Sequence, residues 1–185
     1  MYNIAFALLM IAAVGAAQET QNRQVTVVPS IDVKRYMGTW YEIARLPNTF
    51  QNKCVSDVTA TYSLMEDGDI QVVNRCRKAD GSMSEATGRA KKADDDGPNT
   101  KLKVRFAPAL LSFLPFVWGD YWIIDLASDY SYAVIGDPDR KYLWLLSRTP
   151  SMDEVKVQAI LDRVKRQGYD LTKLIYTTNT ANKGK

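Results

Sequence analysis

The sequence predicts an all-β protein: an eight-stranded antiparallel up-and-down β-barrel, with one C-terminal α-helix packed outside it and a short final strand. Three observations predict this fold. Segments rich in Val, Ile, Tyr, Trp and Thr recur at spacings of roughly 8–12 residues. The turns between them are short and contain Gly, Pro or Asp, as at Asp67-Gly68 and Asp137-Pro138. After Pro150 the apolar period changes from that of a strand to that of a helix.

The strands are expected in sequence order along the chain. Alternation is clearest in the second, where Val58, Ala60 and Tyr62 share one face, while Ser and Thr occupy the other. Short turns favour up-and-down connections, and closing the sheet into a barrel removes its edges. About eight strands are expected, at Gly38–Leu46, Val55–Leu64, Ile70–Lys78, Ser82–Lys92, Thr100–Phe106, Gly119–Leu126, Tyr130–Gly136 and Tyr142–Arg148.

One amphipathic helix follows the strands. Ser151 and Glu154 have the spacing of a capping box, and Gly168 stands where a helix typically ends. The apolar stripe of this helix consists of Val157, Ile160, Leu161 and Val164. This stripe must lie against the outside of the sheet, so we expect Leu143 and Leu145 to face it. The segment Leu171–Tyr176 is then predicted as the short final strand.

Length and composition predict one domain, since the chain has 185 residues and is 46% hydrophobic. The uncharged start of the chain, apolar from Ile4 to Val14 and ending in small residues, predicts a signal peptide over 1–17. The alternative, a transmembrane anchor, requires roughly 20 apolar residues, and this run is shorter. We expect flexible segments at 18–30 and 179–185 on either side of a barrel over 31–178. No Cys follows the small residues, so we expect no lipid anchor through an N-terminal Cys.

Charge and residue content exclude several function classes. The formal net charge is +3 with acidic and basic residues mixed, which does not predict a nucleic-acid partner. The chain contains no His, so it lacks the usual general base and the commonest metal ligand. We therefore expect no enzyme activity, no metal site and no cofactor.

Two cysteines, Cys54 and Cys76, are predicted to form a disulfide, because an exported chain enters an oxidising compartment. A hairpin with Leu64 opposite Gln71 would leave the two sulfurs several residues out of step, so a bend or bulge before Val55 must close the gap. A free Cys facing the barrel interior stays open as the alternative.

Three motifs resemble the lipocalin family. Gly38-Thr39-Trp40 resembles its Gly-x-Trp motif at the first strand, Ser128-Asp129-Tyr130 resembles the Thr-Asp-Tyr turn between strands six and seven, and Arg148 resembles the Arg that closes strand eight. The resemblance covers roughly 31–176, and over 139–150 it is most similar to bacterial outer-membrane lipocalins and apolipoprotein D. It implies that Trp40 plugs the closed end under a cation–π contact from Arg148.

The resemblance also divides the residues by role. Gly38, Trp40, Asp129, Tyr130 and Arg148 are implied to stabilise the fold rather than to bind ligand. It further implies a secreted, periplasmic protein associated with the outer membrane or free of it, although eukaryotic secretion also fits. A few lipocalins are isomerases with a reactive Cys in the barrel, and this remains an alternative that requires a free thiol.

An eight-stranded barrel encloses one small ligand. The expected ligand is a lipid such as a fatty acid or lysophospholipid, carried by a monomer or homodimer; the alternative is a tetrapyrrole or other pigment. Strand parity predicts that the lining is aromatic and aliphatic, and for each residue ordinary core packing is the competing interpretation. The expected lining residues are Ala44, Ala60, Tyr62, Val104, Phe106, Tyr121, Ile123, Val134, Tyr142 and Trp144.

The segment 107–118 is long, apolar and uncharged, and we expect it at the mouth of the barrel. Loops are ordinarily polar. Three interpretations are open: a lid over the cup, a patch that touches a membrane or a second subunit, or a loop folded onto its own core. Its main apolar residues are Leu110, Leu111, Phe113, Leu114 and Phe116.

Overall fold

The structure is a computed structural model that describes residues 24–180. The predicted signal peptide at 1–17 lies outside the described residues, as do 18–23 and 181–185 of the segments expected to be flexible.

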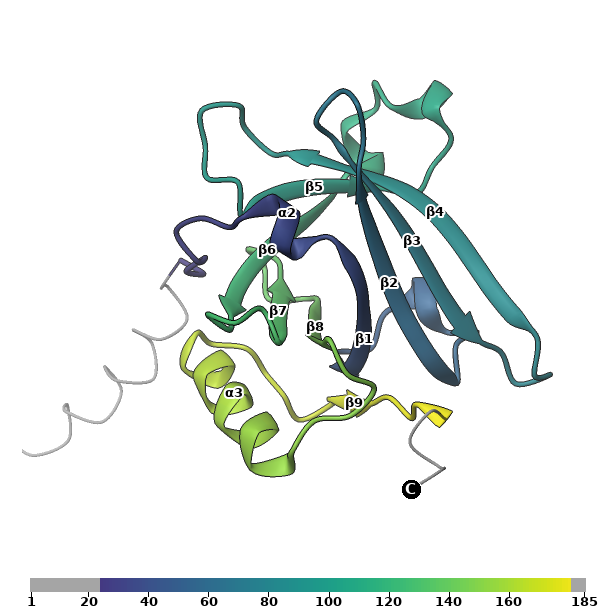
Figure 1. Cartoon of the computed structure of the whole chain (residues 1–185), viewed down its shortest axis with the longest axis vertical. Helices are drawn as coiled ribbons and strands as arrows, with labels where there is room; N and C mark the ends of the chain where they lie inside the picture. Colours follow the sequence, from purple (N-terminus) through teal and green to yellow (C-terminus); the bar gives the residue numbers. More distant parts are fainter. Residues whose placement is uncertain (1–23, 181–185) are drawn as a thin grey trace, which may run out of the picture.

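The strands form one closed antiparallel barrel, which confirms the predicted fold class (Figure 1). Neighbouring strands follow the order β2-β3-β4-β5-β6-β7-β8-β1, and β1 pairs with β2 to close the ring through Gly38↔Tyr62 to Tyr41↔Thr59. The eight strands of the ring are β1 Gly38–Arg45, β2 Ser56–Leu64, β3 Ile70–Arg77, β4 Met83–Lys92, β5 Lys101–Arg105, β6 Gly119–Leu126, β7 Tyr132–Gly136 and β8 Leu143–Ser147.

Each of the eight predicted barrel strands is present, with its ends shifted by at most two residues. The final strand is shorter than predicted: β9 contains only Ile175–Tyr176 and pairs with Ala44 and Arg45 of β1. Its predicted first half is a turn instead, in which the Leu174 amide donates to the Leu171 carbonyl at 3.0 Å.

The β2–β3 register differs by one residue from the expected one. Ser63, not Leu64, lies opposite Gln71, and the pairing shifts between Ser56 and Thr59. Asp57 at this bulge has a φ of 53°. The bulge therefore lies within β2 rather than before Val55, and it brings the strand start to the end of β3, where Cys54 and Cys76 form the predicted disulfide.

Helix α3, Glu154–Arg166, lies outside the barrel as predicted, and its apolar stripe is buried (Figure 1). The expected cap is wrong: Asp153, not Ser151, is the N-cap, and its carboxylate accepts from the Lys156 amide at 3.0 Å. The helix ends as predicted, since Gly168 follows it with a φ of 90°.

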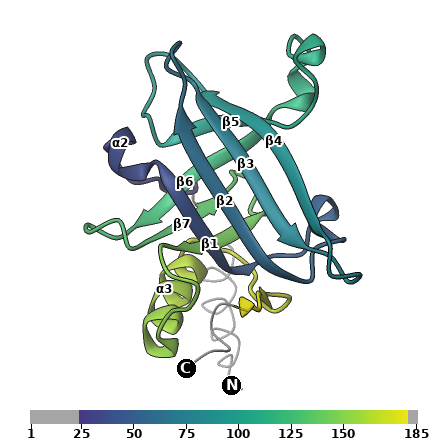
Figure 2. The ribbon, with the colours of Figure 1, turned by 45° about the vertical axis from the view of Figure 1, so that its right-hand side comes forward.

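Two apolar clusters lie on opposite faces of the barrel wall. The outer cluster joins α3 to β1, β6, β7 and β8 and includes Leu143 and Leu145, as expected. The inner cluster contains residues from all eight strands of the ring and from the short helix α2, Val33–Tyr36. Because α3 covers only part of the wall, the outer faces of β2, β3 and β4 are left to solvent (Figure 2).

Segments before and after the barrel pack onto it. Val25 is buried in the outer cluster, and the Val28 amide donates to the Ile123 carbonyl at 3.0 Å. At the other end Asn179 is buried, and its amide group donates to the Glu42 carbonyl at 3.1 Å. The parts of 18–30 and 179–185 that the structure describes are thus fastened to the barrel.

The two ends of the barrel differ. Helix α2 lies across one end, beside the beginning of β1, and closes it (Figure 1). The opposite end carries three short 3₁₀ turns: η1 Thr49–Gln51 between β1 and β2, and η2 Ala109–Leu111 and η3 Pro115–Val117 between β5 and β6. Within the described residues, no helix combines the length and hydropathy needed to cross a bilayer.

Candidate ligand-binding cup

The closed end is sealed by Trp40, which is fully buried. Its indole Nε1 donates to the Tyr36 carbonyl at 2.9 Å, and the Arg148 guanidinium lies 3.8 Å from the ring centroid. Arg148 also donates to the carbonyls of Thr39, Arg35 and Tyr36 at 2.7–3.1 Å. The contact implied by the sequence motifs is therefore present, and it fixes α2 across the barrel end.

The other two motif positions hold the same helix. Tyr130 has a φ of 62°, its hydroxyl accepts from the Asp32 amide at 2.8 Å, and the Arg35 guanidinium lies 4.0 Å from its ring centroid. The Asp129 carboxylate accepts from the Ser131 amide at 2.9 Å and so closes this turn. Gly38 has a φ of 93° and lies against Arg148, where a Cβ would be 3.4 Å from Nη1.

Above the plug, three tyrosine hydroxyls form a floor inside the barrel. The hydroxyls of Tyr36 and Tyr121 are 2.8 Å apart, and Tyr121 donates to Tyr62 at 2.9 Å. Burial raises the pKa of Tyr62 to about 12 and raises the pKa values of Tyr36 and Tyr121 as well. The three groups therefore stay neutral hydroxyls at physiological pH.

Toward the mouth, inward-facing side chains are partly exposed instead of buried. Tyr121 lies at the boundary between the buried and the partly exposed part of the interior. Closer to the mouth are Ala60, Val104 and Trp144, which were predicted to line the barrel and are each partly exposed. Phe106 is 42% exposed and lies against Gly88, where a Cβ would come within 2.7 Å of its ring. We call the part of the interior lined by these partly exposed residues, from the tyrosine floor to the mouth, the cup.

Aromatic rings and a polar network fix one side of the mouth. Tyr142 and Trp144 stack with ring centroids 6.0 Å apart, and Phe50 lies 5.3 Å from Tyr142. The Gln51 amide oxygen accepts from Trp144 Nε1 at 2.8 Å, and its nitrogen donates to Glu42 at 2.7 Å. These contacts hold the loop containing η1 beside the cup.

Glu42 is the buried carboxylate of this network. Burial raises its pKa, although hydrogen bonds from Thr177 and Gln51 and the charge of Arg45, 3.2 Å away, act in the opposite direction. The network joins β1, the η1 loop and the segment after β9. Sequence reasoning missed it, because nothing in the local pattern shows which distant side chains surround Glu42.

Two of the predicted lining residues are placed wrongly. Ala44 and Val134 are fully buried in the outer cluster, beneath α3, and not in the cup. The pairing of β1 with β8 shifts between Glu42 and Ala44, and this bulge reverses the facing of Ala44. Strand β7 is buried on both faces, so its sequence carries no alternation that would distinguish Val134 from the inward Ile135.

Two further predicted residues face inward but lie in the packed half. Ile123 is fully buried and Tyr62 is 5% exposed, so both belong to the floor beneath the cup. The prediction also omitted inward residues of β3 and β4, among them Asn74 and Gly88, which the register places on the same face as Val72 and Ala90. The polar composition of these strands concealed their inward face.

The apolar loop 107–118 projects from the mouth (Figures 1 and 2). Leu110, Phe113 and Phe116 are 82%, 75% and 80% exposed, while Leu111 and Leu114 are less so. The interpretation in which this loop folds onto its own core is therefore wrong for its three most exposed residues. At the base of the loop, the Trp118 indole donates to the Ser112 carbonyl at 2.8 Å.

Comparisons with known proteins agree with this geometry. A family model described as "Lipocalin-like domain" matches residues 31–179. Temperature-induced lipocalin-1 of Arabidopsis thaliana is 43% identical, and the match covers 84% of this chain and 83% of that protein. Outer membrane lipoprotein Blc of Escherichia coli K12 is 42% identical over 94% and 93%. Apolipoprotein D of Mus musculus is 35% identical over 84% and 80%.

Solved structures support the fold. Insecticyanin from the tobacco hornworm Manduca sexta superposes with a TM-score of 0.63 at 20% identity, covering 84% of each chain. The cockroach allergen Per a 4 superposes with a TM-score of 0.61 at 17% identity, covering 83% of this chain and 92% of that one. With its closed barrel, its end sealed by Trp40 and these matches along most of its length, the chain belongs to the lipocalin family.

Proposed function

We propose that this protein carries one lipid, such as a fatty acid or a lysophospholipid, in the cup, and performs no catalysis. Membership of the lipocalin family supports binding of a small hydrophobic ligand. The observation that carries the proposal is the partly exposed apolar and aromatic wall formed by Ala60, Val104, Phe106, Tyr142 and Trp144. Such a wall stabilises an acyl chain by removing it from water.

The chemistry of the cup favours a ligand with a modest polar head. The tyrosine floor offers hydroxyls, and the partly exposed Tyr121 is the one nearest to the mouth. On the mouth side, Trp144 and Gln51 are already hydrogen-bonded to each other. The cup therefore combines this apolar wall with a small number of polar groups, among them Asn74, which matches an acyl chain with a polar head better than a highly polar molecule.

Native mass spectrometry of freshly isolated protein tests the ligand class. We expect an added mass that dissociates as a fatty acid or a lysophospholipid, from a preparation without visible absorbance. A coloured preparation, with the added mass of a tetrapyrrole or another pigment, would replace the lipid proposal with the pigment alternative.

A pair of substitutions on β2 tests where the ligand lies. Ala60 faces the cup, whereas its neighbour Thr59 faces outward. Ala60→Phe fills the cup and should lower the affinity for a fluorescent fatty acid, while Thr59→Phe adds a ring on the other face and should not. Equal affinities of the two variants would place the ligand elsewhere.

The exposed loop supports exchange of the ligand with a membrane surface. Leu110, Phe113 and Phe116 together present apolar side chains to solvent beside the mouth, and exposed apolar patches mark contact sites. Several relatives are outer membrane lipoproteins by name. We therefore propose a secreted protein that acts at the outer membrane.

Phe113→Asp combined with Phe116→Asp tests the membrane contact. This double variant should lose most of its association with phosphatidylcholine vesicles, because it places charge where apolar side chains would enter the bilayer. Val155→Asp is the matched control, since Val155 is 79% exposed but lies on α3. Unchanged association of the double variant would remove the membrane step and leave the carrier proposal intact.

The isomerase alternative lacks its nucleophile. Both cysteines of the chain are in the Cys54–Cys76 disulfide, so neither supplies the free thiol that this chemistry requires. A thiol titration under native and denaturing conditions should find no free thiol.

A further inference from the structure

Four cations on the outer face of β4 and β5 form two directly opposed pairs, and Lys101 lies further along the same face. The register places Arg89 opposite Arg105 and Lys91 opposite Lys103. Like charges at directly opposite positions of an antiparallel pair repel each other. This face therefore requires negative charge from elsewhere.

Carboxylates of the chain neutralise only half of this charge. Arg89 pairs with Asp67 and Asp69, and Lys103 pairs with Asp120 at 2.8 Å. Within residues 24–180, no carboxylate forms an ion pair with Lys91 or Arg105.

Lys91 and Arg105 contact an aromatic ring instead. They lie 4.7 Å and 5.1 Å from the ring centroid of Trp118, at the base of the apolar loop. A cation–π contact supplies no negative charge, so it stabilises the two cations only in part.

Of these two cations, Arg105 has the greater need of a counter-ion, because it is buried. It is only 7% exposed, its Nη1 donates to the Ala107 carbonyl, and its Nε has no hydrogen-bond partner among the described residues. A buried guanidinium without a counter-ion is costly, and leaving one of its N–H groups unpaired adds to that cost. Residues 24–180 thus offer no hydrogen-bond acceptor for the Arg105 Nε–H group and no carboxylate for its charge.

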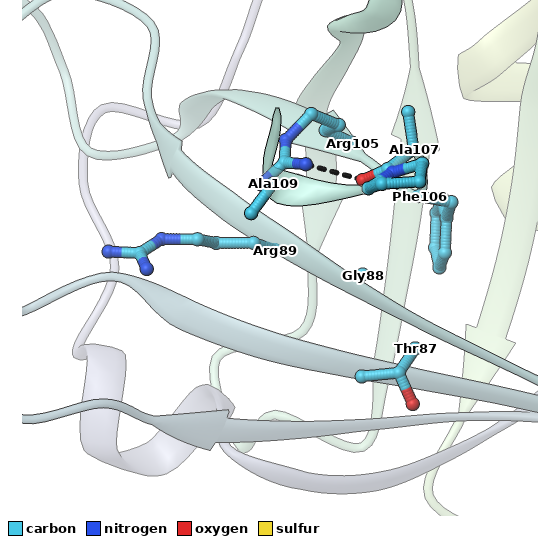
Figure 3. A pocket seen from close by; sticks show the side chains of 8 residues that line it. Thr87, Gly88, Arg89, Arg105, Phe106, Ala107 and Ala109 are labelled. Atoms are coloured by element: carbon cyan, nitrogen blue, oxygen red, sulfur yellow. Dashed lines mark hydrogen bonds between the residues drawn. The ribbon is translucent and has the colours of Figure 1, made fainter. Parts of the chain in front are cut away.

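A pocket of about 310 Å³ adjoins this group, between β4 and the segment after β5 (Figure 3). Its wall contains Thr87, Gly88 and Arg89 on one side and the run from Arg105 to Ala109 on the other. In Figure 3 the Arg89 side chain points away from Arg105 and Ala107, and it pairs with Asp67 and Asp69. Arg105 is then the cation of the pocket that no carboxylate of residues 24–180 neutralises. We call it the rim pocket.

The rim pocket lies directly beside the exposed part of the loop. Its last lining residue, Ala109, precedes Leu110, which is 82% exposed. An anion held at Arg105 would therefore sit next to side chains suited to the apolar part of a bilayer. A lipid phosphate occupies that position, since it lies at the boundary between headgroup and acyl chain.

We propose that the rim pocket binds the phosphate group of a membrane lipid through Arg105, with Lys91 adding positive charge. This assignment of the lipid source rests on the membrane contact proposed above. The rim pocket shares Gly88 and Phe106 with the edge of the cup, but Arg105 lies on the outer face of β5. A phosphate held at Arg105 would therefore lie beside the ligand in the cup and not in its place.

The first experiment observes Arg105 without a membrane. Glycerol 3-phosphate, titrated into uniformly ¹⁵N-labelled protein, should shift the Arg105 Nε–H resonance and the Gly88 amide resonance to saturation. The Arg163 Nε–H group, which already donates to Asp125, serves as the internal reference. Absence of a saturable shift at Arg105 overturns the proposal, even if the loop proves to bind vesicles.

The second experiment identifies the source of the phosphate. Arg105→Gln should weaken binding to vesicles that contain phosphatidylglycerol about tenfold, the loss typical of a charge-assisted hydrogen bond. Lys101→Gln is the matched control, because it removes the same charge from the same outer face of β5, where Lys101 lies over Trp122. Equal vesicle affinities of the two variants, together with a shift from glycerol 3-phosphate, would mean a soluble anion and would overturn the assignment to lipid.

Both experiments remain interpretable if the Arg105→Gln variant fails to fold. The resonance titration uses the unaltered protein, and an Arg105→Lys variant keeps the charge over Trp118 while it removes the Nε–H donor. That variant should retain vesicle binding better than Arg105→Gln. Failure of the loop variants alone would refute the membrane contact while leaving the resonance shift at Arg105 readable.

Discussion

At the scale of single residues, the closed end of the barrel depends on Arg148. Its side chain combines a cation–π contact with Trp40 and donation to three carbonyls. Arg148→Met keeps the stem but removes both kinds of contact and leaves the carbonyls without this donor. We expect the free energy of unfolding in urea to fall by roughly 2–4 kcal/mol.

Arg148→Lys is the comparison for this prediction. Lysine keeps the charge over Trp40 but cannot reach three carbonyls with one planar group, so its stability should lie between those of the parent and Arg148→Met. A loss below about 1 kcal/mol for Arg148→Met would show that α2 closes the barrel without this residue.

Asp57 predicts a specific dependence of stability on pH. Partial burial alone raises the pKa of Asp57, but hydrogen bonds from Arg77, Thr180 and Ser56 outweigh it and lower the pKa from 3.8 to about 2. The folded pKa lies below the unfolded one, so the stability that Asp57 contributes is fully present above pH 3.8. It is lost as the pH falls through about 2.

The variant Asp57→Asn tests this dependence. Asparagine tolerates the positive φ of 53° at this bulge, so the substitution removes the charge without adding backbone strain. Its free energy of unfolding should be lower than the parent's at neutral pH, and the two should converge as the pH approaches 2. Asp95→Asn, in the exposed turn between β4 and β5, is the control for removal of one acidic charge from the surface. A difference between Asp57→Asn and the parent that stays constant with pH would contradict the titration of Asp57.

At the scale of elements, two substitutions test which residue caps the N-terminus of α3. Asp153→Ala should lower the free energy of unfolding by about 1 kcal/mol, because the Lys156 amide loses its acceptor. Ser151→Ala should change it by less than about 0.5 kcal/mol, since the Ser151 side chain is exposed and precedes the cap. Urea unfolding of both variants measures the difference, and the reverse order would restore the capping box expected from the sequence.

Element boundaries were largely predictable, but the facing of residues within elements was not. The apolar stripe from Val157 to Val164 and the terminating Gly168 are signals within one short stretch of sequence, so local periodicity was enough to predict the helix. Ala44 and Val134 failed for two different reasons. A β-bulge turns Ala44 to the opposite face of the sheet from the one that strict alternation predicts. Helix α3 covers the outer face of β7, so apolar residues occupy both faces of that strand and alternation does not distinguish Val134 from its inward neighbour.

At the scale of the whole molecule, the Cys54–Cys76 disulfide joins the η1 loop to the end of β3 across a sequence separation of 22 residues. The double variant Cys54→Ser, Cys76→Ser should lower the free energy of unfolding by about 2–4 kcal/mol, because the unfolded chain regains the entropy of that loop. Urea unfolding with and without reductant measures this. Reductant should bring the parent to the value of the variant and leave the variant unchanged.

The location of the candidate site was predictable, and its residues only in part; that these residues bind a ligand stays a prediction. Ala60, Val104, Phe106, Tyr121, Tyr142 and Trp144 lie in or at the cup as expected. The Glu42 network and the rim pocket were not predicted, because each unites residues from distant strands and loops. Whether Lys91 and Arg105 are neutralised depends on where every carboxylate of the chain comes to lie.

The sequence by itself determined the order and type of the elements, the sealed end and the disulfide partners. Turn residues, apolar periodicity and the three motifs are each defined within short stretches of sequence, so they can be recognised without knowing the tertiary structure. Only the tertiary structure decided which faces of β1 and β7 point inward, which interior side chains stay partly exposed, and which cations of the described residues lack a carboxylate. Those properties arise where the wall closes on itself and α3 covers one side of it, since burial and charge compensation are sums over contacts between residues far apart in the chain.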